Sequence, residues 1–173
     1  MRLRPYQKKD FEVISKWITQ ERAHALWCAN LLPYPMEEEG FYKLLAEAEE
    51  RFGDSPFVAT TEEGKVVGFF CFSVNLSTNE GMLKFVVIDA SERNKGYGCE
   101  MLKLAVKYAF EIAKVDAVQL NVFAENPGAR KCYEKVGFKE RAFTEGAFPY
   151  KEEVWGRCNM VIFREDRRKI PFG

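Results

Sequence analysis

The stretch D-A-S-E-R-N-K-G-Y-G, Asp89–Gly98, decides the fold because it joins a strand pattern to a helix pattern. The run Met82–Ile88 before it is mostly apolar, and from about Gly98 apolar residues recur at helical spacing. The two glycines of the stretch let backbone N–H groups converge at the start of the helix, where the helix dipole is positive. With Arg93 and Lys95 alongside, the stretch predicts a site for the phosphate groups of a ligand.

The spacing of Gly96 and Gly98 disfavours two common phosphate loops. A P-loop reads G-x-x-x-x-G-K-[ST], and this chain contains no such run. The dinucleotide fingerprint G-x-G-x-x-G requires a third glycine, and Met101 stands in that place. In addition, Ala90–Lys95 separates the strand from the first glycine, whereas the fingerprint turns tightly from strand to helix.

The pattern R-x-x-G-x-G from Arg93 to Gly98 resembles the [QR]-x-x-G-x-[GA] pyrophosphate loop of the GNAT superfamily of N-acetyltransferases. A strand pattern at Ala117–Ala124 follows, and then the block E-N-P-G-A-R-K-C-Y-E-K-V-G-F, Glu125–Phe138, which is similar to the family's E-N-x-x-A-x-x-x-Y-E-K-x-G-F segment. The opening Leu3–Pro5, with a helix behind it, resembles the branch that contains ribosomal-protein N-terminal acetyltransferases and polyamine acetyltransferases. The resemblance covers roughly residues 3 to 163.

The resemblance implies an α/β (α+β) acyl-CoA N-acyltransferase fold, with a central mixed, mainly antiparallel sheet flanked by helices in a single domain, 1–173. Strands Met82–Ile88 and Ala117–Ala124 are expected to lie side by side, parallel, and to diverge at their C-terminal ends; the right-handed connection through the helix supports this. The patterns predict further helices at Asp10–Gln20 and Met36–Arg51, and further strands at Phe57–Thr61, Lys65–Leu76, Phe138–Ala147 and Glu153–Phe163.

The resemblance also implies that acetyl-CoA binds as a co-substrate where the two parallel strands diverge. Pantetheine is expected to bond the backbone near Val86 and Ile88, with Asn126 and Tyr133 facing it from the other side. The tyrosine of the family's matching segment protonates the departing thiolate, so Tyr133 is the expected general acid. The pyrophosphate is expected on the amides of the loop, formed by Arg93, Asn94, Lys95, Gly96, Tyr97 and Gly98.

Asn126 and Tyr133 of the second block also have purely structural interpretations. Asn126 before Pro127 is typical of a helix N-cap, and Gly137 stands where that helix should end. Tyr133 shares a helical face with Val136, and a buried tyrosine needs no catalytic purpose. Asn126 is therefore either a helix cap alone or also a ligand contact. Tyr133 is either a core residue alone or also the general acid.

The sequence assigns no general base. Family members often carry a carboxylate on one of the two parallel strands, but Met82–Ile88 contains only Lys84 as a charged residue, and the next strand has Gln119 and Asn121. We expect Asn121 to orient a water that relays the proton of the amine. The remaining candidates lie in loops or at strand ends: Glu80, Glu125 and Glu145.

Composition narrows the class of protein further. The 26 basic and 26 acidic residues balance, so the chain offers no general attraction for nucleic acid. No apolar run approaches a membrane span and no signal peptide is recognised, so a cytoplasmic protein is expected. Five scattered cysteines and one histidine, without a C-x-x-C pair, make a metal site or a disulfide framework unexpected.

Within these bounds, the resemblance implies an enzyme that transfers an acetyl group from acetyl-CoA to a primary amine by direct attack in a ternary complex. The acceptor is either a small-molecule amine or a protein N-terminus, and the sequence does not choose between them. The oligomeric state is left open, a homodimer included. A catalytically silent module that binds acyl-CoA for regulation is the alternative, because no strand carboxylate serves as base.

Overall fold

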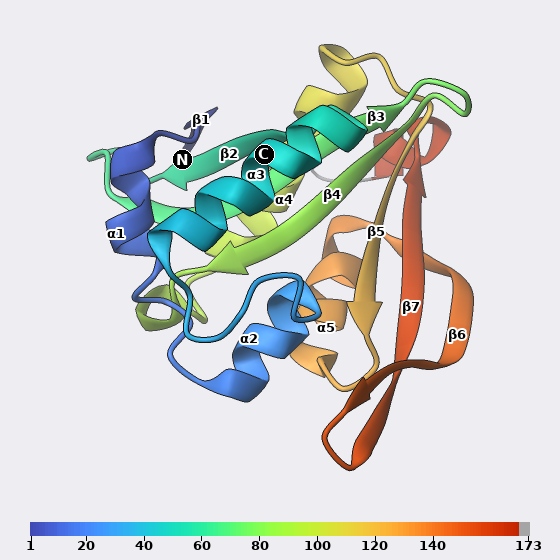
Figure 1. The fold of residues 1–173 in the computed structure, drawn as a ribbon. Coiled ribbons are helices and arrows are strands. Elements are labelled where there is room, and N and C mark those ends of the chain that lie inside the picture. Colours follow the sequence, from blue (N-terminus) through green and yellow to red (C-terminus); the bar gives the residue numbers. More distant parts are fainter. Residues whose placement is uncertain (170–173) are drawn as a thin grey trace.

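The computed structural model describes residues 1–169, so positions 170–173 of the expected domain lie outside the described residues. Its sheet has seven strands in the order β1-β2-β3-β4-β5-β7-β6 (Figure 1). The strands are β1 (Arg2–Pro5), β2 (Ser55–Thr60), β3 (Val66–Asn75), β4 (Glu80–Ile88), β5 (Ala117–Phe123), β6 (Lys139–Tyr150) and β7 (Glu153–Phe163). The α-helices are α1 (Phe11–Ile14), α2 (Glu21–Cys28), α3 (Glu38–Phe52), α4 (Tyr97–Glu111) and α5 (Pro127–Val136), with 3-10 turns η1 (Lys8–Asp10), η2 (Ala90–Glu92) and η3 (Arg164–Lys169).

The sheet confirms the expected fold class. Strands β4 and β5 pair in parallel, while the other neighbouring strands pair antiparallel. The β4–β5 ladder joins only Glu80–Met82 to Ala117–Gln119, and Figure 1 shows the two strands separating towards their arrowheads. The predicted divergence is therefore present, and it lies between the strands that the sequence placed there.

Helices cover both faces of the sheet. Helices α4 and α5 pack on one face, where they share a core with Val118, Leu120 and Val122 of β5. Residues from α1, α2 and α3 pack on the other face, over Phe69 of β3 and Val87 of β4. Figure 1 shows α3 in front of the sheet, with α4 and α5 behind it. Alternate residues of β5 face opposite sides of the sheet, with Val122 on the side of α4 and α5 and Phe123 on the side of α2.

The predicted helix Asp10–Gln20 is wrong in its extent. Helix α1 ends at Ile14, and Gln20 has extended backbone angles, φ −121° and ψ 137°, before α2 begins. Trp17 and Ile18 are nevertheless buried, so tertiary packing places their apolar side chains without a continuous helix. Sequence reasoning missed α2 as a separate element and placed its residues in a connection.

Two other boundaries differ from the prediction. The second predicted helix begins at Glu38 rather than near Met36, and strand β6 continues to Tyr150, beyond the predicted end at Ala147. Within residues 1–169, no helix combines the length and apolar character that a membrane crossing requires. In the same part of the chain, no three His, Cys, Asp or Glu side chains gather as a metal site.

Candidate active site

A bulge in β4 accompanies the divergence of the two parallel strands. Phe69 of β3 faces Val87 and Cys71 faces Lys84, so one residue of β3 lies opposite two of β4, Phe85 and Val86. Phe85 has φ +54°, a left-handed conformation that is uncommon for a residue with a bulky side chain. Bulges bend a strand and increase its local twist, which here accompanies the separation of β4 from β5.

Among the described strands, β4 has a stretch without a strand partner on its β5 side. The parallel ladder ends at Met82, six residues before the end of β4 at Ile88. Val86 and Ile88, which we expected to bond pantetheine, lie on this unpaired stretch. Backbone N–H and C=O groups along an unpaired edge are available to an extended ligand. Their contact with pantetheine stays a prediction.

The loop before α4 has the backbone shape of an anion site. Asn94 has φ +67° and Gly96, the residue that precedes α4, has φ +80°. A Cβ atom at Gly96 would meet no heavy atom within 4 Å, so the space beside this glycine is open. Upstream, the Asp89 carboxylate accepts hydrogen bonds from the amide and hydroxyl of Ser91 and holds the loop. Left-handed residues next to a helix N-terminus expose amides in the way that phosphate sites require.

The two cations of the loop are not equivalent. Lys95 forms an ion pair with Glu92, and Lys65 pairs with the same carboxylate. Hydrogen bonds from these two lysines lower the pKa of Glu92. Arg93 is exposed and has no ion-pair partner among the residues described. Arg93 is therefore the cation that remains fully available to a phosphate.

Gly98 has a packing role that the sequence did not reveal. A Cβ atom there would lie 3.3 Å from the Cys132 sulfur and 3.6 Å from Cγ1 of Ile88. The first turn of α4 thus approaches α5 and the end of β4 closely. Gly96 has open space beside it and Gly98 does not. A side chain added at Gly96 would therefore enter the space expected for the phosphates without disturbing the packing, whereas one added at Gly98 would also press on Cys132 and Ile88.

The capping interpretation of α5 is confirmed. The side chain of Asn126 accepts a hydrogen bond from the Ala129 amide at 3.4 Å, and Pro127 occupies the first turn. At the other end, Gly137 has φ +119° and its amide bonds the carbonyls of Tyr133 and Glu134. These caps fix where α5 begins and ends, and so they fix the position of Tyr133. A bond from the Asn126 amide group to a ligand stays a prediction.

Tyr133 lies in the core between α5 and the sheet. Its side chain is 7% exposed, and its ring meets Phe138 edge to face with centroids 6.2 Å apart. Within residues 1–169, the hydroxyl has no hydrogen-bond partner. Burial and the neighbouring Cys132 raise the pKa of Tyr133, so the phenol keeps its proton. The ring therefore packs as a core residue does, while the hydroxyl keeps its capacity to donate.

Helix α2 bridges the diverging strands on the face opposite α4 and α5. Trp27 donates its indole N–H to the carbonyl oxygen of Phe85 at 2.9 Å, which ties α2 to the bulge of β4. On the other side, Ala25 packs with Phe123 of β5 and Trp155 of β7. The only signal for this helix in the sequence was the spacing of His24, Ala25 and Cys28, all of which are buried.

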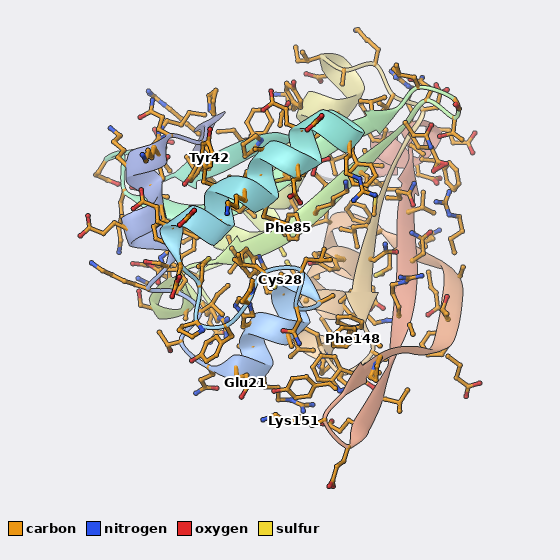
Figure 2. The ribbon with its side chains drawn as sticks, in the orientation of Figure 1. Glu21, Cys28, Tyr42, Phe85, Phe148 and Lys151 are labelled. Carbon is orange, nitrogen blue, oxygen red and sulfur yellow. The ribbon has the colours of Figure 1, made fainter. Side chains whose placement is uncertain are left out.

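Two ion pairs fasten α2 to the hairpin of β6 and β7. Arg22 pairs with Glu153 and lies over the Trp155 ring, 5.1 Å from its centroid. Glu21 accepts a hydrogen bond from Lys151 at 3.2 Å, and Figure 2 shows these two side chains together at the end of the hairpin. Helix α2 therefore has attachments to β4, β5 and β7 around the divergence.

The candidate bases lie in different surroundings. Glu80 is paired with Arg141 at 2.7 Å, and Glu145 is exposed on β6. Oxygen Oε2 of Glu125 is buried and has no hydrogen-bond partner within the described part of the chain. Asn121 is exposed on β5, and its side-chain oxygen accepts a hydrogen bond from Asn159 at 3.0 Å. Of the three carboxylates, only Glu125 follows β5 directly.

The register of the parallel ladder places Asn121 relative to the bulge. Met82 pairs with Gln119, so Asn121, two residues further along β5, is level with residues 84 and 85 of β4. Glu125 lies beyond the end of β5 at Phe123. Among the candidate bases, Asn121 is therefore the one at the height where the strands separate beside the bulge.

A sheet that separates between two parallel strands, beside the glycine-containing start of a helix, is the architecture expected of an acyl-CoA N-acyltransferase. The sequence model of the Acetyltransferase (GNAT) family matches residues 12–138. This chain belongs to that family, and the expectation of an acetyltransferase enzyme is confirmed.

Known proteins of this kind are similar to the chain over most of its length. The L-amino acid N-acetyltransferase AaaT of Escherichia coli (strain K12) is 22% identical over 142 residues, which is 79% of this chain and 82% of AaaT. Spermidine N-acetyltransferase from Vibrio cholerae, solved in complex with CoA and spermine, superimposes with a TM-score of 0.82 at 18% identity, over 96% of this chain and 97% of that chain. A chimera of the V. cholerae enzyme SpeG and hSSAT gives a TM-score of 0.80 at 18% identity, over 98% of this chain and 99% of the chimera. These structural likenesses establish the fold.

Proposed function

We propose that this chain transfers the acetyl group of acetyl-CoA to a primary amine by direct attack in a ternary complex. The observation that carries the proposal is the unpaired stretch of β4 beside the N-terminus of α4. A strand edge suits the amide groups of pantetheine, and the helix start suits the pyrophosphate to which pantetheine is joined. CoA and its thioesters have both of these parts in this order, and acetyl-CoA is the thioester that we propose for this chain.

Each part of acetyl-CoA has a proposed partner. The pyrophosphate lies on the amides of Arg93 to Gly98, with the Arg93 side chain as the neighbouring cation. Pantetheine bonds the backbone of Val86 and Ile88, and the Asn126 side chain bonds it from α5. The acetyl group then lies near the bulge of β4, where α2 is attached through Trp27.

Tyr133 is the proposed general acid. The amine attacks the thioester carbonyl, a tetrahedral oxyanion forms, and the thiolate of CoA leaves as the carbon–sulfur bond breaks. A phenol beside the sulfur gives its proton to the departing thiolate. The raised pKa of Tyr133 supports this role because the hydroxyl remains a proton donor throughout the neutral and moderately alkaline range.

The amine loses its proton through a water held by Asn121, which is exposed and level with the bulge. Glu125 is the competing proton acceptor, because one of its carboxylate oxygens is buried and has no hydrogen-bond partner among residues 1–169. The acceptor approaches from the side of α2, opposite the helices α4 and α5. Its class is a small-molecule amine or a protein N-terminus.

One experiment tests the function directly. The protein is incubated with acetyl-CoA and a panel of polyamines, L-amino acids, aminoglycosides and N-terminal peptides, and the release of free thiol is followed. Release with one class of amine, abolished in Tyr133→Phe, is the expected result. Tight CoA binding without release across the panel would favour the silent regulatory module. A cytoplasmic location stays a prediction, checked by cell fractionation, and light scattering measures the oligomeric state, which the sequence did not assign.

A further inference from the structure

Two thiols meet where α4 and α5 come together. Cys99 lies in the first turn of α4 and Cys132 in the middle of α5, and their sulfur atoms are 3.4 Å apart. Both side chains are half-buried, so each retains some access to solvent. The other three cysteines, Cys28, Cys71 and Cys158, are buried. No other pair of thiols in residues 1–169 is in sulfur-to-sulfur contact.

The packing around the pair holds the two sulfurs close. A Cβ atom at Gly98 would lie 3.3 Å from the Cys132 sulfur, so the glycine before Cys99 permits this approach. The Cys99 sulfur also lies 3.8 Å from the carbonyl oxygen of Cys132. A disulfide has a sulfur-to-sulfur distance of about 2.05 Å, so the two atoms must approach by about 1.4 Å to bond.

We propose that Cys99 and Cys132 form a reversible disulfide when the protein meets hydrogen peroxide, and that this bond weakens the binding of acetyl-CoA. The Cys99 thiolate attacks one peroxide oxygen, the O–O bond breaks, and Cys99 becomes a sulfenic acid while hydroxide leaves as water. The Cys132 sulfur then attacks the sulfenic sulfur and a second water leaves. In sum, two thiols and one peroxide give one disulfide and two waters.

The surroundings decide which thiol reacts first. Burial, together with the adjacent Cys99 thiol, raises the pKa of Cys132, so Cys132 keeps its proton near neutral pH. Because the thiolate is the nucleophile, Cys99 meets the peroxide and Cys132 resolves the sulfenic acid. Cys132 gives up its proton only as the new bond forms, to the departing hydroxide. A dithiol reductant reverses the bond by exchange.

The bond connects two segments that hold the proposed ligand. The first turn of α4 presents the amides for the pyrophosphate, and Cys132 directly precedes Tyr133 on α5. Drawing the sulfurs together moves these segments relative to each other, away from the spacing that fits acetyl-CoA. If acetyl-CoA binds the reduced protein more tightly than the disulfide form, thermodynamic linkage requires that bound acetyl-CoA disfavour the disulfide by the same factor. The effect on acetyl-CoA, unlike the bond itself, rests on the proposed function.

The test treats the full chain with graded hydrogen peroxide, blocks the remaining thiols with an alkylating agent, and maps the peptides by mass spectrometry. We expect a Cys99–Cys132 linked peptide that dithiothreitol removes, and that saturating acetyl-CoA, which carries no free thiol, suppresses during oxidation. Calorimetry with acetyl-CoA should show an affinity at least about 10-fold lower for the oxidised protein. In Cys99→Ser and Cys132→Ser, peroxide should produce no linked peptide and no change in CoA affinity, whereas Cys28→Ser should respond like the parent.

The outcomes separate the two parts of the proposal. Oxidation of Cys99 to sulfinic acid without a linked peptide would overturn the disulfide. A linked peptide with unchanged CoA affinity would overturn its effect on the ligand. Absence of CoA binding before oxidation would instead count against the proposed function, while the linked peptide would still be measured.

Discussion

The indole N–H of Trp27 donates to the carbonyl oxygen of Phe85 at 2.9 Å, and this bond joins α2 to the bulge of β4. The ring of Trp27 also meets the Phe85 ring, with centroids 6.0 Å apart. Phe85 is the left-handed residue of the bulge, so α2 is attached at the point where β4 turns away from β5. The position of α2, on the side from which the amine is proposed to approach, therefore depends on the shape of β4, the strand that is proposed to hold the thioester.

We expect Trp27→Phe to affect the amine more than CoA. The substitution keeps an aromatic ring but removes the hydrogen bond, which contributes on the order of 1 kcal/mol. Helix α2 then loses its bond to the bulge, and the KM for the amine should rise by roughly 3- to 10-fold while CoA affinity changes little. Steady-state kinetics and calorimetry measure the two quantities. Tyr34→Phe is the control, since it removes a hydrogen bond to Thr19 in the same region without touching the bulge.

Gly96→Asp should abolish tight CoA binding. An aspartate there places a carboxylate in the open space beside the helix start, against the phosphates. Gly64→Asp is a matched control. Gly64 also has a positive φ, +89°, and a Cβ atom added there would also meet no heavy atom within 4 Å. Gly64 lies instead in the turn between β2 and β3. The two variants carry similar backbone strain, so calorimetry isolates the phosphate effect. Equal CoA affinity in the two variants would show that the pyrophosphate does not bind at this loop.

The sequence predicted the regular parts of the site more closely than its irregular parts. The glycines, Asn126, Pro127 and Gly137 act through local backbone geometry, and their places in the chain suffice to predict the start of α4 and the caps of α5. The divergence of β4 and β5 followed from the family resemblance. The start of α4 and the caps of α5 are visible in the sequence because each depends on a few neighbouring residues.

Features that depend on distant contacts could not be read from the sequence. The bulge at Phe85 places a bulky residue at φ +54°, which no local preference indicates. Helix α2 was hidden because Trp17 and Ile18 continue the helical spacing of α1 although the chain has already left the helix. The contact between Cys99 and Cys132 joins residues of two helices, and only the packing of those helices brings them together.

Tyr133→Phe should lower kcat by on the order of 10²-fold while CoA affinity stays nearly constant. The ring remains to pack against Phe138, so only the proton donor is lost. Burial raises the pKa of Tyr133, and a group with a raised pKa stays protonated above the ordinary value of about 10. The kcat of the parent enzyme should therefore show no decline between about pH 8 and pH 10. A decline of kcat within this range, or an unchanged kcat in the variant, would leave Tyr133 with core packing as its only role.

Asn121 is exposed and level with the bulge, where it is proposed to hold the water that takes up the proton of the amine. If a water held by Asn121 relays the proton, Asn121→Ala should lower kcat at pH 7 by roughly 10-fold, less than the loss of a direct side-chain base. The loss should shrink as the pH approaches about 10, because a free alkyl amine needs no relay. Asn121→Asp should do the opposite and raise the rate at pH 6 to 7, since it supplies a carboxylate on β5 at the same place.

Glu125→Gln distinguishes the competing route. Its carboxylate lies past the end of β5, so its loss should raise the KM of a cationic amine and leave the pH profile of kcat unchanged. Glu145→Gln, on exposed β6, serves as the control and should change neither quantity. The measurement is kcat and KM from pH 6 to 10 for the parent and the four variants. A pH-dependent loss of kcat in Glu125→Gln, with Asn121→Ala indistinguishable from the parent, would transfer the role of proton acceptor from the water at Asn121 to Glu125.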